Sequence, residues 1–439
     1  MTTDTHARQV ETGALPVRAR LAVAAERLAS GASRGLRRGS GDMIGGKLAL
    51  RVDPQITARL AARRPAACVS GTNGKTTTTR LLAAALGVLG PVASNSGGAN
   101  MTPGVIHALA RPPYDAPAAL EVDEIWLPSV ARAVRPRAVL LLNISRDQLD
   151  RSNETRRIAA LWRSLGAELR GTTAVANADD PLVVWAAQGF SAQKWVSAGQ
   201  NWTADAMVCP NCAQLLHRDA GTSLPSSPDG SNSSSAPDWW CTCGLRRPAP
   251  TATVTGPREI LVDDAQLTVD LTLPGRVNAG NAALAMSAAE LFGVEPEAAL
   301  AAMAAVTAVE GRYSEVSLVP GRRARLLLAK NPAGWVEMLE LLDGTPPRPV
   351  VIDFNSRVAD GRDPSWLWDV PFERLAGREV WVTGERKEDV SVRLTYAGVP
   401  HQVVAQAAAA AREASADLVD VVANYTAFRD LLVSTRADR

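Results

Sequence analysis

Residues 70–80, SGTNGKTTTTR, decide the fold of this chain. A loop that binds phosphate needs glycines so that backbone N–H groups can face the oxygens, a lysine for the terminal phosphates and a Ser or Thr hydroxyl for Mg²⁺. Gly71, Gly74, Lys75 and Thr76 meet these needs. The apolar segment PAACVSG before the loop predicts a short buried strand, and TTTTRLLAAALGVLG after it predicts a helix. The stretch therefore indicates a strand–loop–helix unit that binds a nucleotide.

The predicted nucleotide contacts cover the whole loop: Gly71, Thr72, Asn73, Gly74, Lys75, Thr76 and Thr77. The loop departs from the usual pattern at one position, because the glycine expected six residues before the lysine is Val69. Lysine is scarce in this arginine-rich chain, and a retained lysine indicates a need for a compact point charge. We interpret Lys75 in this way. Lys330, in AKNPAG, stays open between that role and chance.

Further apolar runs predict a parallel sheet around the loop. APAALEVDE, PRAVLLLNIS and GTTAVANADDP each end in polar residues, and helical segments separate them. Strands that alternate with helices form parallel α/β sheets, whose ligands bind at the carboxyl ends of the strands. Glu121, at the end of one such run, is therefore a predicted Mg²⁺ ligand.

Other polar residues near strand ends allow two interpretations. Asp123 and Glu124 are more typical of solvated acids. Asn177, Asp179 and Asp180 either contact the nucleotide or substrate, or form a turn before the proline that follows them.

Four of the five cysteines form two close pairs, CPNC with Cys209 and Cys212, and CTCG with Cys241 and Cys243. Two such pairs separated by a loop are typical of a zinc ribbon, although the second pair has one intervening residue instead of two. Four protein ligands close the coordination sphere, so the predicted zinc is structural. Cys68 lies within a predicted strand and is interpreted as a small buried hydrophobe.

The length of 439 residues is typical of about three domains. We predict an N-terminal helical segment over 1–50 and a central α/β nucleotide-binding domain over 51–315, with the ribbon inserted at about 205–248. RPVVIDFN, REVWVTGER, HQVVAQ and DLVDVVANYTA predict the strands of a C-terminal, Rossmann-like α/β domain over 316–439. The low-complexity stretch 219–238 carries no predicted element.

The charge is nearly balanced, with 47 basic and 45 acidic residues, so we expect no nucleic-acid partner. No apolar run of about 18 residues occurs and the N-terminus lacks a signal-peptide core, which predicts a cytoplasmic protein. The arginines of residues 1–50 are interpreted as a solvated helix face. The alternative is attraction to an anionic membrane, which would make the protein peripheral at its inner face.

The loop ADGRDPSWLWD contains Asp360, Asp363 and Asp369. It is either a packed surface loop with an Asx turn, or it presents a carboxylate that orients a histidine of another chain. None of the four histidines lies in a recognisable catalytic frame, and no thiol is left for a Cys–His nucleophile. We therefore do not expect this chain to hydrolyse glutamine by itself.

GTNGKTTT resembles the ATP loop of the Mur ligase family, which forms acyl phosphates on peptidoglycan precursors. SGGANM, RDQLDR, NADDP, the four-cysteine ribbon, AKNPAG and ADGRDPSW together resemble one branch of this family, the synthetase subunits that amidate lipid II. The resemblance runs from about residue 40 to near the C-terminus. SGGANM lacks an acid directly before GAN, which leaves the substrate contacts there open.

The resemblance implies ATP-dependent amidation of the α-carboxylate of D-glutamate in the lipid II stem peptide, through an acyl phosphate. It implies ATP, Mg²⁺ and Zn²⁺ as cofactors, and a heterodimer with a GatD-type glutaminase that supplies ammonia. Lipid II would be met at the inner membrane face.

By motif, Lys75 and Glu121 would act in catalysis, and Thr76 and Glu121 would bind Mg²⁺. Asn281, in NAGNAAL, resembles a nucleotide-contacting asparagine of the family, and its alternative role is a helix N-cap. Asp363, preferred over Asp360, resembles the acid that completes the partner's Cys–His pair.

Two rival functions share parts of this pattern. A Mur-type ligase that adds an amino acid has the same loop and the same acyl phosphate, but the ribbon and DGRDPSW argue against it. A zinc-ribbon nucleic-acid binder is disfavoured by the balanced charge and by the lack of an aromatic-basic face.

Overall fold

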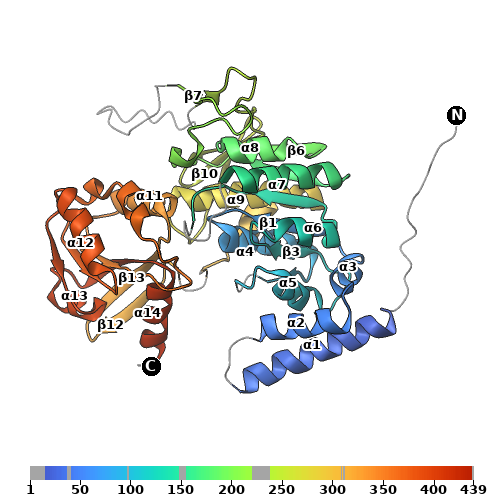
Figure 1. The fold of residues 1–439 in the computed structure, drawn as a ribbon, viewed down its shortest axis with the longest axis horizontal. Coiled ribbons are helices and arrows are strands. Elements are labelled where there is room, and N and C mark those ends of the chain that lie inside the picture. The colour runs from blue at the N-terminus through green and yellow to red at the C-terminus, as the bar shows by residue number, and fades with distance from the viewer. Residues whose placement is uncertain are drawn as a thin grey trace.

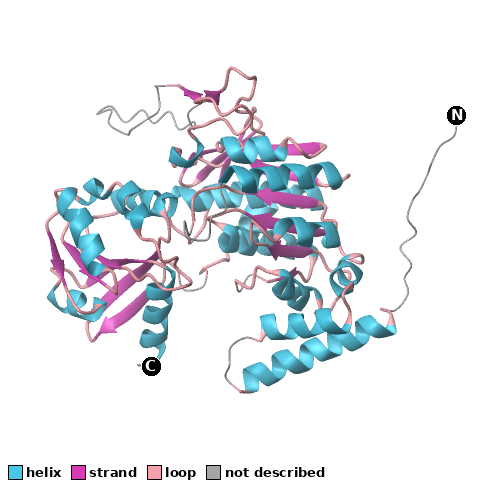
Figure 2. Ribbon diagram, viewed as in Figure 1, coloured by secondary structure: helices cyan, strands magenta, loops and turns pink. Residues whose placement is uncertain are grey.

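The computed structural model describes residues 15–36, 41–95, 98–147, 155–219, 238–307, 309 and 312–437. Ser96 and Gly97 of SGGANM, residues 148–151 of RDQLDR and residues 220–237 of the low-complexity stretch lie outside the described residues. Two large sheets organise the chain, a central one and a smaller C-terminal one, and helices cover both (Figure 2).

The central sheet has nine strands in the order β11-β10-β9-β6-β5-β4-β1-β3-β2. Its strands from β2 to β9 pair in parallel, and β10 and β11 add an antiparallel edge. The bounds are β1 (Ala66–Ser70), β2 (Ala93–Ser94), β3 (Ala118–Glu121), β4 (Ala138–Leu141), β5 (Thr173–Asn177), β6 (Ala192–Ser197), β9 (Ala252–Gly256), β10 (Glu259–Val262) and β11 (Ala265–Thr268). The four runs read as strands around the loop contain β1, β3, β4 and β5, so these predictions are confirmed.

Buried apolar side chains lie on both faces of this sheet. One face packs against α4 (Lys75–Leu86), α9 (Arg276–Ala289) and α10 (Pro296–Met303). The other packs against α3 (Ile56–Ala61), α5 (Thr102–Leu109), α6 (Leu127–Val134), α7 (Thr155–Glu168) and α8 (Pro181–Ala187). Because both faces are covered, the inner strands are continuously apolar, as parallel sheets require.

The N-terminal helices form a hairpin of α1 (Val17–Gly35) and α2 (Asp42–Val52) below the central domain (Figure 1). The helical segment predicted over 1–50 contains both helices of this hairpin, and residues 41–46, GDMIGG, cap and begin α2. The glycines allow close packing there. A Cβ on Gly45 would lie 2.2 Å from Ser30 Oγ, and one on Gly46 would lie 2.0 Å from the carbonyl oxygen of Pro103.

The C-terminal sheet has the order β12-β13-β17-β14-β15-β16 and is parallel except for the β12–β13 pair. Its strands are β12 (Glu315–Val319), β13 (Arg322–Leu328), β14 (Val350–Asp353), β15 (Val380–Thr383), β16 (His401–Val403) and β17 (Leu418–Ala423). Helices α11 (Pro332–Asp343) and α12 (Lys387–Tyr396) cover one face, and α13 (Ala407–Glu413) and α14 (Tyr425–Ala437) cover the other. This confirms the Rossmann-like fold, while the boundary at 315/316 stays a prediction.

The segment between β6 and β9 leaves the central sheet and carries β7 (His217–Arg218) paired with β8 (Trp239–Trp240). It stands at the top of the molecule in Figure 1. Across the described part of the chain, no helix combines the length and hydrophobicity that a bilayer-spanning segment requires.

Candidate active site

The phosphate loop joins β1 to α4 at the carboxyl end of the central sheet. Gly74 is the N-cap of α4 with φ +85°, and a Cβ there would lie 2.7 Å from Asn281 Oδ1. Gly71 has φ +153°, and its Cβ would lie 2.7 Å from Leu142 Cβ. Both positions therefore require glycine, and the loop delivers free N–H groups at a helix N-terminus, where an anion is stabilised.

A second loop, which follows β4, fixes the phosphate loop from the side. Asn143 accepts a hydrogen bond from the backbone N–H of Asn73 at 2.9 Å, and its amide donates to the Asn73 carbonyl at 3.0 Å. Thr72 donates through its hydroxyl to the Ser145 carbonyl at 3.2 Å and accepts from the Ser145 N–H at 3.0 Å. These contacts of Thr72 and Asn73 with Ser145 and Asn143 hold the phosphate loop in one conformation.

Lys75 lies among four carboxylates. Its Nζ is 3.1 Å from Glu124 Oε2, and both side chains are nearly buried. Burial opposes the charge of Lys75, but Glu124, Glu121, Asp123 and Asp147 outweigh it and raise the pKa of the amine above its ordinary value. The amine therefore stays positive, and in this structure it also donates to the carbonyl oxygens of Gly71 at 2.5 Å and Thr72 at 3.3 Å.

The acids beside Lys75 differ in the direction of their pKa shifts. Burial raises the pKa of Asp123, and the neighbouring Glu124 raises it further. Burial also opposes the charge of Glu124, but Lys75 and Lys330 hold the pKa of that carboxyl below its ordinary value. The interpretation of Glu124 as a solvated acid was wrong, because the chain after β3 turns back under the phosphate loop.

Glu121, the last residue of β3, is 2% exposed. Its backbone N–H donates to Asn95 Oδ1 at 2.8 Å, and its Oε1 lies 3.4 Å from the amide of Asn100. A buried carboxylate that ends a strand next to the phosphate loop has the donor type that Mg²⁺ takes in nucleotide sites, and Thr76 follows Lys75 at the start of α4. The donor types of Glu121 and Thr76 suit Mg²⁺, and a Mg²⁺ site at these two residues stays a prediction.

Asn281 lies on α9 directly beside the phosphate loop. Thr78 donates to its Oδ1 at 3.1 Å, and its amide donates to Asn278 Oδ1 at 3.3 Å. The alternative role as an N-cap is wrong, because α9 begins at Arg276 and Gly275 precedes it. A nucleotide contact by Asn281 stays a prediction.

The C-terminal domain reaches into this site through two contacts. Asn331, the N-cap of α11, exchanges two amide hydrogen bonds with Asn73, at 3.1 and 3.2 Å. Lys330 Nζ lies 2.5 Å from Asp147 Oδ2. Lys330 therefore uses its charge to join the two domains beside the phosphate loop.

Asp179 and Asp180, in contrast, support the fold. Asp180 caps α8 by accepting from the N–H groups of Leu182 and Val183, and it also accepts from Ile144 N–H. Asp179 accepts from the N–H of Gly199 at 2.8 Å. Asn177 forms an Asx turn, since its Oδ1 accepts from the N–H of Asp179 at 3.0 Å, and a contact of these three residues with the nucleotide or substrate stays a prediction.

The four cysteines converge as predicted. Their sulfur atoms all lie within 4.8 Å of one another, with Cys209 and Cys243 at 3.7 Å and Cys212 and Cys241 at 3.4 Å. Four sulfurs about 2.3 Å from a zinc ion would lie about 3.8 Å apart, so the cluster fits a tetrahedral site. Gly244, with φ +93°, lets the chain turn back directly after the second pair.

The acidic loop after β14 separates its aspartates into different environments. Asp360 is buried and accepts from the backbone N–H groups of Thr426 at 2.8 Å and Arg357 at 3.1 Å. Asp363 is exposed, and the N–H of Ser365 donates to it at 2.9 Å and lowers its pKa. Asp363 is therefore an ionised carboxylate that a second chain could reach, whereas Asp360 holds the loop together.

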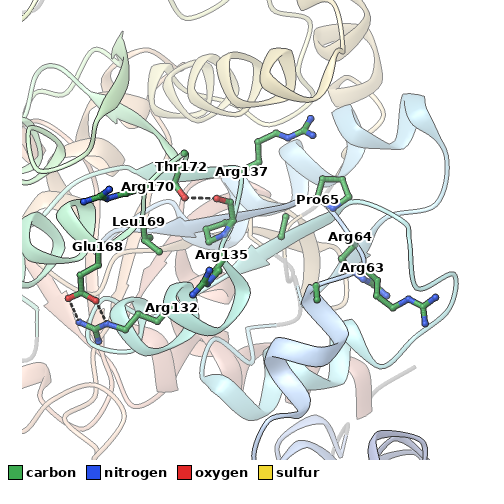
Figure 3. Close-up of a pocket in the computed structure, with 14 residues that line it drawn as sticks. Arg63, Arg64, Pro65, Arg132, Arg135, Arg137, Glu168, Leu169, Arg170 and Thr172 are labelled. Atoms are coloured by element: carbon green, nitrogen blue, oxygen red, sulfur yellow. Dashed lines mark hydrogen bonds and ion pairs between the residues drawn. The ribbon is translucent and has the colours of Figure 1, made fainter. Parts of the chain in front are cut away.

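A cavity of about 870 Å³ lies at the opposite end of the central sheet, where β1, β4 and β5 begin (Figure 3). Arginines line it, but they do not converge. In Figure 3 the side chains of Arg63, Arg137 and Arg170 point in three different directions, and Arg132 is paired with Glu168. Because the guanidinium groups diverge, this cavity does not form a phosphate site comparable to the loop.

Comparisons with known proteins agree with this geometry. Residues 69–289 match the Mur ligase middle domain, and residues 328–428 match the MurT ligase C-terminal domain. The chain belongs to the Mur ligase family. Its C-terminal domain makes it a Mur ligase of the MurT type, and hence an ATP-dependent ligase.

Relatives within the Mur ligase family cover almost the whole chain. It is 27% identical over 434 residues to the lipid II isoglutaminyl synthase (glutamine-hydrolyzing) subunit MurT of Streptococcus pneumoniae, which spans 92% of this chain and 95% of that protein. It is 29% identical over 407 residues to the subunit of the same name from Staphylococcus aureus strain COL, with 87% and 88% covered. A pseudomurein peptide ligase type C from Methanothermus fervidus has the same fold, with a TM-score of 0.65, 17% identity and coverage of 85% and 79%.

Sequence reasoning missed three residues of this Mur ligase site. Asn143 and Ser145 immobilise the phosphate loop, and Asp147 joins Lys330. All three follow β4, so the rule that polar residues gather at the carboxyl ends of parallel strands could have indicated them.

Proposed function

We propose that this chain activates the α-carboxylate of D-glutamate in the lipid II stem peptide and converts it to the amide of D-isoglutamine. A carboxylate oxygen attacks the γ-phosphorus of ATP and ADP leaves, which gives an acyl phosphate. Ammonia then attacks the acyl carbon and inorganic phosphate leaves. A carboxylate is a poor electrophile, and the acyl phosphate supplies the leaving group that amide formation needs.

The chain's own residues account for the first step. Lys75 would bind the transferring phosphoryl group, and the N–H groups of Gly74 and its neighbours would bind the other phosphates. Thr76 and Glu121 would hold Mg²⁺, which neutralises charge on the phosphates. The contact between Asn73 and Asn331 supports this role, since it closes the C-terminal domain over the loop.

The proposal of amidation, rather than amino-acid addition, rests on the environments of the cysteines and of Asp363. Four cysteines form the cluster, and burial raises the pKa of the Cys68 thiol to about 12. No thiol of this chain therefore suits the nucleophile of a glutaminase, so ammonia derived from glutamine would come from another chain. The exposed, ionised Asp363 fits the acid that would orient a histidine of a GatD-type glutaminase in a heterodimer.

We further propose that the cysteine cluster binds Zn²⁺ as a structural site. We also propose that the reaction takes place in the cytoplasm, at the inner membrane face, where the chain would bind a lipid-linked peptide.

The test is mass spectrometry of lipid II after incubation with this chain, ATP, Mg²⁺ and ammonium. We expect a carboxylate-to-amide mass change on D-glutamate together with ADP release. If product forms only when an amino acid is added, the chain is an amino-acid-adding ligase and the proposal is wrong. If nothing forms with ammonium, the same assay with glutamine and the glutaminase decides.

A further inference from the structure

Helix α1 is apolar on two opposite sides. Its buried side includes Ala19, Ala22 and Val23 and faces α2 and the central domain. Val17, Leu21 and Leu28 are nevertheless 63%, 59% and 75% exposed. With 3.6 residues per turn, the positions 17, 21, 24 and 28 share one stripe, which lies directly opposite the buried side. A solvated surface helix would place polar residues there.

Arginines run along one flank of this stripe. Arg20, Arg27 and Arg34 repeat every seven residues and are all exposed. Seven residues correspond to about two turns, so the three guanidinium groups form one row. Arg27 is partly engaged, since it donates to the Ala110 carbonyl at 3.2 Å, but it keeps its charge.

The carboxylates of the hairpin face inward. In the described residues 15–36 and 41–52 these are Glu26 and Asp42, and both contact His107 of α5. Glu26 is buried and also accepts from Ser30 Oγ at 2.8 Å. The outer surface of α1 therefore combines exposed apolar side chains with positive charge and has no carboxylate to offset it.

The position of α1 leaves this surface open. Figure 1 shows α1 as the outermost element of the molecule, with α2 between it and α5. The stripe points away from both sheets, so no other described element covers it.

We propose that the outer face of α1, defined by Val17, Leu21, Leu28 and the row Arg20, Arg27 and Arg34, docks on an anionic lipid membrane. Helices that lie in a membrane interface combine an apolar stripe with flanking Lys or Arg, and anionic headgroups add attraction. A second copy of the chain docked through the same face is a poorer occupant, because two such arginine rows would repel each other and the described residues of α1 and α2 offer no exposed acid. The purpose of docking rests on the proposed lipid-linked substrate, whereas the binding itself does not.

Docking would also fix the orientation of the active site relative to the membrane. The hairpin is fixed to α5 through His107, and α5 begins just after Asn100, whose backbone carbonyl accepts from Asp123 N–H at 2.9 Å. The membrane-facing helix is thus joined through α5 to the segment next to Glu121.

The experiment is co-sedimentation of the full chain with vesicles of equal parts phosphatidylglycerol and phosphatidylcholine, without substrate or ATP. We expect binding to these vesicles, little binding to phosphatidylcholine alone, and a loss of about 10-fold or more in Leu21→Ser/Leu28→Ser. Arg20→Gln/Arg34→Gln should lose a similar factor and flatten the salt dependence. The matched controls are Val433→Ser, exposed on α14, and Arg412→Gln, exposed on α13; both should bind like the wild type.

Several outcomes would overturn the proposal. Wild-type protein that stays in solution, or α1 variants that bind like the controls, would exclude this face as a membrane contact. A concentration-dependent dimer that Leu21→Ser/Leu28→Ser abolishes, seen by sedimentation velocity, would assign the face to a second copy. Amidation of a soluble stem peptide without the lipid should be equal in wild type and variants, so failure of the proposed function would appear in that assay and not in the vesicle assay.

Discussion

Asn73 of the phosphate loop and Asn331 of the C-terminal domain exchange two amide hydrogen bonds, at 3.1 and 3.2 Å. Asn331 also accepts from Gly334 N–H at 2.8 Å and so caps α11. One side chain therefore begins a helix in one domain and closes that domain on the loop of the other. This pair of amides joins the two domains together with the ion pairs of Lys330 with Asp147 and of Arg146 with Asp369.

Asn331→Ser separates these two roles. Serine is a good N-cap, so α11 and the melting temperature should be preserved, but its side chain is too short to reach Asn73. We expect kcat/KM for ATP to fall by about 10-fold, because the domain that completes the site is no longer held in place. Steady-state kinetics and a thermal melt check this. An unchanged kcat/KM would show that the amide pair is irrelevant to closure.

Lys75 has a structural role as well as a chemical one. Lys75→Ala should lower turnover by at least about 100-fold, since a preorganised charge is lost from the phosphate site. It should also destabilise the fold by about 3 kcal/mol, because Glu124 is left buried without its partner.

The double variant Lys75→Ala/Glu124→Gln tests this account. It removes the unpaired charge, so we expect stability to recover while turnover stays low. Urea unfolding measures the first effect and ADP release the second. Recovery of turnover in the double variant would contradict the role of Lys75 in phosphate binding.

The cysteine cluster predicts a metal content. Elemental analysis should find about one zinc per chain, and Cys212→Ser should lose it. Chelation should unfold the segment that contains β7 and β8, because so small a module has little core of its own apart from Trp239, Leu245 and their neighbours. Limited proteolysis before and after chelation measures this. The phosphate loop lies in a separate core, so nucleotide binding should survive.

Substitutions of Asp363 and Asp360 provide a matched pair of variants that tests the proposed contribution of Asp363 to the partner's active site. Asp363→Asn removes an exposed charge, so we expect glutamine-driven amidation to fall strongly while ammonium-driven amidation and the melting temperature are unchanged. Asp360→Asn should instead lower the melting temperature, because Asp360 accepts from Thr426 and Arg357 within the loop. Equal loss of both nitrogen sources in Asp363→Asn would refute the shared-site idea.

The sequence was sufficient where chemistry is local. The strand–loop–helix unit of β1 and α4, the strands around it and the convergence of the cysteines follow from spacing and periodicity, and each is confirmed. The nucleotide contacts of the loop stay a prediction. The sequence was insufficient where a role depends on tertiary contacts. Glu124 reads as a solvated acid until the turn after β3 buries it beside Lys75, and Asp180 reads as a ligand candidate until it is seen to cap α8. The contact between Asn73 and Asn331 joins residues 258 positions apart, which no local pattern encodes.

Glu337 makes the stability of the C-terminal domain depend on pH. Desolvation of the half-buried Glu337 on α11, and then the neighbouring Glu340, raise the pKa of Glu337 to about 8, against the opposing charges of Arg276 and Arg374. Between the unfolded pKa of 4.5 and this value the folded state binds one proton more than the unfolded state, so stability falls as pH rises through this window.

Glu337→Gln keeps the neutral shape and removes the titration. We therefore expect its melting temperature to match that of the wild type near pH 4.5 and to exceed it by about 2–4 °C at pH 8.5. Glu388→Gln, at an acid of the first turn of α12, is the control and should show no such divergence. Parallel melting curves for wild type and Glu337→Gln across the window would show that Glu337 is ionised in the folded protein.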